Sequence, residues 1–180
     1  HLPNASLDSM RAIARAAGRP LTFSVGTGNS GPQVWPALLD QLAEANAEGL
    51  VMKGQRMPRA IGMILGFELT LNPFYTTPTY RRLASLPLQE RLVELRKPPV
   101  RDAILSEPVD PDPALVLGRM VRQFDTMFLL GSPPDYEQPP ERSIAAMAAA
   151  RGISPEALAY DVMVQGEAGG KLYLAMANFH

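Results

Sequence analysis

The chain has 180 residues, of which 46% are hydrophobic and 19% charged, so it can bury a substantial core and its length favours one domain. The formal charge is −1, and 14 arginines and three lysines form no basic run, so neither nucleic acid nor a membrane surface is an expected partner. The absence of cysteine excludes disulfides, thiolate metal ligands and a cysteine nucleophile. It also fits a reducing compartment, and we expect a cytoplasmic protein.

The first third of the chain predicts alternating helices and strands. Apolar residues recur at helical spacing in two segments, and each of these is followed by a short segment rich in β-favouring residues. The expected order is a helix that begins after Asn4 or Ser6 and stops at Gly18, a strand over Leu21–Val25, a helix over Gln33–Ala47 with Gly49 after its end, and a strand over Leu50–Met57. This alternation is typical of parallel βαβ architecture.

Prolines divide the rest of the chain into short pieces. The 18 prolines are spread along the sequence, and a mostly apolar stretch at 60–71 is too short to cross a bilayer. The predicted helices are Tyr80–Ser85, Leu88–Arg96, Val100–Glu107, Glu141–Arg151 and Pro155–Gln165, and the predicted strands are Met127–Leu130 and Lys171–Ala177. For the last helix, Ser154 is the expected N-cap and Gly166 the expected stop. Helix is therefore expected to exceed strand.

A glycine-rich segment lies between the first strand and the second helix. Gly26, Gly28 and Gly31 have the spacing of a dinucleotide-binding fingerprint, whose helix N-terminus would hold a pyrophosphate. The acidic residue expected about 20 positions later is missing, although the basic segment 53–56 would suit a 2′-phosphate. Because a βα loop of a barrel is also often glycine-rich, nucleotide or anion binding remains one alternative and a plain connecting loop the other.

The residues needed for several common hydrolytic sites are absent from the sequence. The two histidines are His1 and His180, and no H-x-H, H-E-x-x-H or G-x-S-x-G motif occurs. Carboxylate pairs such as Asp110 and Asp112 lie among prolines, where a solvated loop is the simpler interpretation. We therefore expect the 180-residue chain to be inactive alone and to hold no metal by itself.

Several segments resemble, in order, the amidohydrolases of the D-aminoacylase type, also called N-acyl-D-amino-acid deacylases. No single segment is a chemical motif, so the resemblance depends on their common order over most of the chain. The segments are 18–23, 44–50, 55–66, 71–74, 78–81, 86–91, 128–131 with 134–137, and 154–161.

The resemblance implies an α/β fold, namely part of a metal-dependent-hydrolase TIM barrel with a mostly helical insertion. It implies barrel strand and helix units at 1–79, the insertion at 80–122, and a return to barrel units at 123–180. The chain would then be an internal segment of a larger enzyme that hydrolyses the amide bond of an N-acyl amino acid, and its partners would be this small-molecule substrate and the remainder of the barrel. A non-catalytic structural domain derived from the same family is a further alternative.

The resemblance also implies a cofactor and its ligands. Zinc or another divalent metal would supply a bound hydroxide that attacks the acyl carbonyl. The H-x-H pair and the catalytic Asp of the family would lie outside this chain, and the family's strand-end histidine is replaced by Val25 and the residues after it. His1 is the one candidate metal ligand. Gln55 and Arg59 are the candidate substrate-binding residues, since the arginine fork suits a carboxylate and lies just after a strand.

Overall fold

The computed structural model describes residues 4–25, 34–108, 116–177 and 179, and its secondary structure is mixed α/β. Helix exceeds strand among the described residues, as the sequence predicts. The chain divides into two packing units, one of residues 1–61 with 176–180 and the other of residues 62–175. Within the described part of the chain, no helix has both the length and the apolar character needed to cross a membrane.

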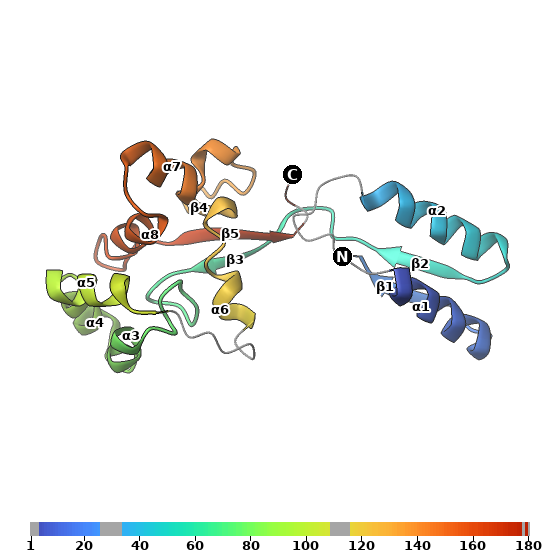
Figure 1. Cartoon of the computed structure of the whole chain (residues 1–180), viewed down its shortest axis with the longest axis horizontal. Coiled ribbons are helices and arrows are strands. Elements are labelled where there is room, and N and C mark those ends of the chain that lie inside the picture. The colour runs from blue at the N-terminus through green and yellow to red at the C-terminus, as the bar shows by residue number, and fades with distance from the viewer. Residues whose placement is uncertain (1–3, 26–33, 109–115, 178, 180) are drawn as a thin grey trace. The chain divides into compact units, whose positions relative to one another are not determined.

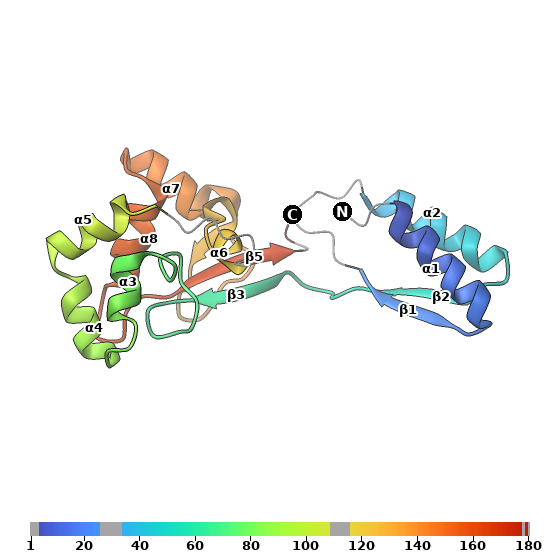
Figure 2. The same cartoon turned by 60° about the horizontal axis from the view of Figure 1, so that its bottom comes forward.

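The first unit is built from two helices and two parallel strands. In chain order they are α1 (Asn4–Ala17), β1 (Leu21–Ser24), α2 (Val34–Ala47) and β2 (Met52–Gln55). The two strands pair in parallel, which confirms the predicted βαβ arrangement. Figure 2 shows α1 and α2 on the same side of the two strands.

Glycine ends both helices of this unit where the sequence predicts it. Gly18 and Gly49 have positive φ angles of 59° and 88°, a conformation that glycine adopts without a steric penalty. The amide of Gly49 donates to Asn46 O at 3.0 Å, and the amide of Leu50 donates to Ala45 O at 3.1 Å. These two bonds form a Schellman motif. Leu50 thus belongs to the end of α2, and the predicted strand at 50–57 is shorter than expected because β2 begins only at Met52.

The core of the first unit lies between the helices and the strands. Its buried residues are Leu7, Ala14, Ala45 and Met52, with partly buried apolar side chains from α1, β1 and α2 around them. The side chain of Asn46 links α2 to β2, because it donates to Met52 O at 3.0 Å and accepts from the Met52 amide at 3.2 Å. The side-chain amide of Asn46 thus pairs with both backbone polar groups of Met52, the first residue of β2.

The second sheet has three strands in the order β3, β5, β4. They are β3 (Ile61–Leu65), β4 (Met127–Leu129) and β5 (Leu172–Ala177), and β4 and β5 are antiparallel. β3 and β5 run in opposite directions (Figure 1). The strands predicted near 127–130 and 171–177 are confirmed to within one residue at each end, whereas β3 was not predicted as a strand.

Short helices surround this sheet. They are α3 (Pro78–Leu83), α4 (Leu88–Leu95), α5 (Pro98–Ser106), α6 (Val116–Met120), α7 (Ile144–Arg151) and α8 (Pro155–Met163), with 3₁₀ turns η1 (Phe124–Thr126) and η2 (Pro140–Arg142). The predicted start of α5 at Val100 is wrong, because Pro98 and Pro99 occupy the first turn, where no N–H is needed. The predicted start of α7 at Glu141 is also wrong. Residues 140–142 form η2, and the Ser143 hydroxyl then caps α7 by accepting from the Ala146 amide at 3.2 Å.

An aromatic cluster lies at the centre of the second unit. The ring of Tyr160 meets Phe67 and Phe74 edge to face, with centroids 5.7 and 5.2 Å apart, and Tyr80 stacks on Phe67 at 5.5 Å. All four residues are buried, so this cluster is part of the core of the second unit. Such pairs add stabilisation to the apolar area they bury.

The described residues form two small sheets and no closed barrel. The predicted divisions after residues 79 and 122 refer to barrel and insertion, whereas the packing units divide after residues 61 and 175. The two divisions describe different properties of the chain. The structure therefore shows that the chain is mixed α/β, and it shows no TIM barrel among the described residues.

Candidate functional site

The carboxyl ends of β1 and β2 lie side by side. Ser24, the last residue of β1, is paired with Gln55, the last residue of β2. The amide of Val25, which follows Ser24, donates to Gln55 O at 2.7 Å. The two strands therefore end at one edge of the sheet. In α/β proteins this edge is where substrates commonly bind.

The side chain of Gln55 lies on the face of β2 opposite the helices. Met52 is buried in the helix-covered core, and a Cβ on Gly54 would lie 2.7 Å from Val25 Cγ2 and 3.5 Å from Leu42 Cδ1. Because side chains alternate along a strand, Lys53 and Gln55 belong to the other face, and both are exposed. Gln55 is thus an exposed amide at the carboxyl end of a parallel strand.

Arg59 lies four residues after the end of β2 and is exposed. No carboxylate of the described residues forms an ion pair with its guanidinium. It is therefore a free cation on the segment that leaves the carboxyl edge of the sheet, where the sequence predicts a contact with a substrate carboxylate. His1 and the Gly26–Gly31 loop both lie outside the described residues.

No group of three or more histidine, cysteine, aspartate or glutamate side chains that could hold a metal ion occurs among the described residues. The donor atoms near Gln55 and Arg59 fit this finding, since an amide and a guanidinium are hydrogen-bonding groups and not a zinc-ligand set. Among the described residues, these two side chains can therefore form hydrogen bonds with a small molecule, but they do not make up a metal-ligand set.

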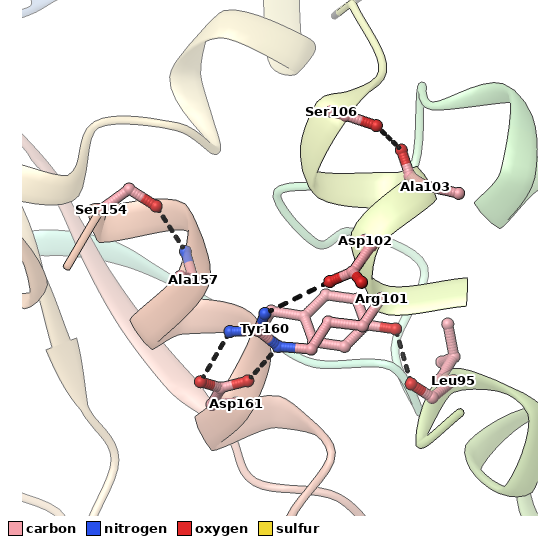
Figure 3. Close-up of polar contacts among 9 residues, drawn as sticks. All are labelled: Leu95, Arg101, Asp102, Ala103, Ser106, Ser154, Ala157, Tyr160 and Asp161. Carbon is pink, nitrogen blue, oxygen red and sulfur yellow. Dashed lines mark hydrogen bonds and ion pairs between the residues drawn. The ribbon is translucent and has the colours of Figure 1, made fainter. Parts of the chain in front are cut away.

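The best-connected polar groups of the second unit join α4, α5 and α8 (Figure 3). Arg101 holds Asp161 with two bonds, Nε to Oδ1 at 2.7 Å and Nη2 to Oδ2 at 3.0 Å, and this hydrogen bonding raises the pKa of the Arg101 guanidinium. The buried hydroxyl of Tyr160 donates to Leu95 O at 2.7 Å, and burial raises its pKa. Each of these groups is engaged in a contact within the protein, so we assign them to the packing of the helices.

A second set of buried polar contacts fixes the loop before α3. Arg122 donates to Pro73 O at 3.0 Å and to Glu156 Oε1 at 2.8 Å, while desolvation lowers the pKa of its guanidinium. Glu107 accepts from the Thr79 amide at 2.9 Å and also from the Thr79 hydroxyl. Arg122 and Glu156 form an ion pair, whereas Glu107 accepts from neutral groups, so each of these charges is engaged within the second unit.

The second unit also contains a cavity of about 400 Å³. Its lining residues are Leu129, Gly131, Asp135, Gln138, Arg142 and Met147. The sequence did not predict this cavity, because the proline-rich segment around 131–140 has the composition of a solvated loop. The only sequence feature that pointed to the cavity was the close succession of an acid, an amide and a base near that segment. Their spacing matches no known motif.

Comparison of the chain with protein-family models, with curated proteins and with solved structures finds no match. The functional interpretation therefore depends on the residues and the geometry of this chain. Two features carry it, namely the carboxyl edge of β1 and β2 in the first unit and the cavity in the second.

Proposed function

We propose that this chain is a segment of a metal-dependent amidohydrolase of the D-aminoacylase type, which hydrolyses the amide bond of an N-acyl amino acid. The observation that carries the proposal is the parallel β1–α2–β2 unit with the Gln55 amide on its helix-free face. In a TIM barrel the helices cover the outer face of the strands, and the active site is built at the strands' carboxyl ends. The ordered resemblance of the chain to this family supports the same assignment.

In this proposal the first unit contributes part of a barrel wall and two substrate contacts. Arg59 binds the carboxylate of the N-acyl amino acid, because its planar fork can donate two parallel hydrogen bonds and its charge is not paired within the described chain. Gln55 binds the amide of the substrate, since a carboxamide can both donate and accept. The metal is left to residues outside the described set, among which His1 is the one candidate ligand of this chain.

The test uses the full-length protein that contains this segment. Release of free amine from N-acetyl-D-leucine and N-acetyl-D-methionine is measured with and without a chelator and after zinc is restored. Arg59→Ala is expected to raise KM by about tenfold or more, because it removes a charge-assisted hydrogen bond, and Arg59→Lys to raise it less. Gln55→Ala is expected to raise KM by a smaller factor.

Arg19→Ala is the matched control. Arg19 is also an exposed arginine of the first unit, but it precedes β1 and so lies toward the opposite, amino end of the strands. Its loss is expected to leave KM unchanged. No hydrolysis of either substrate by the full-length protein, or equal effects of the Arg19 and Arg59 substitutions, would overturn the proposal. The 180-residue chain alone is expected to show no turnover.

A further inference from the structure

The segments that line the cavity of the second unit are held in place by hydrogen bonds to the backbone. Gln138 is buried, and its amide nitrogen donates both to Leu129 O at 2.9 Å and to Asp135 O at 3.0 Å. These bonds hold the loop after β4 against the end of that strand. On the other side, Phe128 is bridged to Ser143, the residue that caps α7. The cavity is therefore formed before any ligand arrives, which lowers the entropic cost of binding.

Two opposite charges line this cavity without neutralising each other. Asp135 accepts a bond from the Glu137 amide at 3.1 Å through Oδ1, and no cationic side chain of the described residues pairs with its carboxylate. The guanidinium of Arg142 likewise has no partner among the described residues. Because oppositely charged groups in one pocket that do not meet can each bind a ligand group, the cavity presents one anionic and one cationic contact.

The remaining surface of the cavity supplies apolar contacts and one acceptor. Leu129 and Met147 form the apolar part of the lining. Both hydrogens of the Gln138 amide are used by backbone oxygens, so its side-chain oxygen is the atom of this amide that is left for a ligand. A volume of about 400 Å³ lies toward the lower end of the range for small-molecule pockets.

We propose that this cavity binds a free α-amino acid with an apolar side chain. The ligand carboxylate pairs with Arg142, its ammonium group with Asp135 and the Gln138 oxygen, and its side chain packs against Leu129 and Met147. This assignment uses only the charges and walls of the cavity and does not depend on the amidohydrolase proposal. The two proposals concern the same class of compound, because hydrolysis of an N-acyl amino acid releases a free amino acid.

The test titrates the 180-residue chain with D- and L-leucine and D- and L-methionine, using ligand-observed saturation-transfer NMR and calorimetry. Since both charged groups are exposed, we expect Kd values of roughly 0.1 to 10 mM. Leucine methyl ester lacks the carboxylate and N-acetylleucine lacks the ammonium group, and each is expected to bind about tenfold more weakly than leucine. This ligand series needs no variant, so it tests the proposal even if a substitution disturbs folding.

Two variants test the assigned groups. Arg142→Gln is expected to weaken leucine binding by about tenfold, and Asp135→Asn by about threefold to tenfold while keeping the Oδ1 acceptor for the Glu137 amide. Arg151→Gln is the matched control, because Arg151 is an exposed arginine at the far end of α7 that does not line the cavity. Absence of saturation transfer at 20 mM, equal binding of leucine and N-acetylleucine, or equal effects at Arg142 and Arg151 would overturn the proposal. None of these readouts uses enzymatic activity, so they separate it from the amidohydrolase proposal.

Discussion

At the scale of single residues, Tyr160 combines two roles in the second unit. Its ring packs in the aromatic cluster, and its hydroxyl donates to Leu95 O and thereby joins α8 to the end of α4. The two roles are separable, because phenylalanine keeps the ring and removes only the hydroxyl. The hydrogen bond can therefore be measured without opening a large cavity.

We expect Tyr160→Phe to lower the free energy of unfolding of the full chain by about 1 to 2 kcal/mol. The substitution leaves the Leu95 carbonyl without its buried donor, and an unpaired buried acceptor costs its desolvation. Urea unfolding followed by circular dichroism measures the change. Tyr136→Phe is the control, since Tyr136 is 41% exposed and should change the free energy by less than about 0.5 kcal/mol.

Tyr160→Phe is also expected to change how the stability of the chain depends on pH. Burial raises the pKa of Tyr160 in the folded state, so above the ordinary tyrosine pKa of about 10 the unfolded chain releases this proton while the folded chain keeps it. The contribution to stability is complete below pH 10 and is lost as the pH rises further. Tyr160→Phe should therefore lose about 1 kcal/mol less stability than the parent chain between pH 9 and 11. An identical loss in both chains would show that the hydroxyl ionises equally in the folded and unfolded states.

At the scale of elements, several helix ends could be predicted from the local sequence. Ser154 before Pro155 predicted the start of α8, and its hydroxyl accepts from the Ala157 amide at 3.2 Å. Gly166, predicted as the stop of this helix, has a positive φ of 70°, but α8 already ends at Met163, two residues before the predicted end. These features could be predicted because a cap is decided by residues within one turn of it.

We expect Ser154→Ala to reduce the free energy of unfolding by about 1 kcal/mol, because the Ala157 amide loses its acceptor at the start of α8. Ser106→Ala is the matched control. The Ser106 hydroxyl donates to Ala103 O at the exposed end of α5, so it satisfies no amide at a helix start (Figure 3). Thermal unfolding of both variants gives the comparison. A loss at Ser106 as large as that at Ser154 would contradict a capping role.

Other elements could not be predicted from their local sequence. β3 is a strand because it pairs with β5, which lies more than 100 residues later in the chain. The apolar stretch at 60–71 is longer than a typical strand of about five or six residues, and nothing in its pattern limits a strand to 61–65. The packing of β3 against β5 requires glycine at position 62, since a Cβ there would lie 2.2 Å from the Tyr173 ring on β5.

At the scale of the whole molecule, the chain has two packing units, and each has buried residues of its own. Met52 is buried in the core of the first unit, together with residues of α1 and α2. Met163 is fully buried on α8 in the second unit. The two methionines thus provide matched positions from which each unit can be destabilised separately.

We expect Met52→Ala to increase amide hydrogen exchange in α1, β1, α2 and β2 by at least tenfold, since truncating a buried methionine costs about 2 to 5 kcal/mol. Peptides from α8 and β4 should keep their exchange rates. Met163→Ala should give the reverse pattern. Both patterns are read by mass spectrometry of the full chain. Faster exchange throughout the chain in either variant would mean that the units unfold as one.

The sequence by itself determined the local features of this protein. It predicted the mixed α/β class, the helix stops at Gly18 and Gly49, the N-cap of the last helix and the parallel βαβ order of the first unit. It also singled out Gln55 and Arg59 at the end of a strand. These features depend on backbone propensity, capping and hydrophobic period, each of which acts over a few neighbouring residues.

Only the tertiary structure decided which distant segments meet. It paired β3 with β5, placed Gln55 on the face of β2 away from the helices, and formed an open cavity between the loop after β4 and the start of α7. Asp135 and Arg142 line one cavity because the Gln138 side chain bonds the loop to the end of β4, and a backbone bridge from Phe128 to Ser143 holds the start of α7 beside that strand. Such contacts carry no local sequence period, since the free energy that selects them comes from burial shared among residues far apart in the chain.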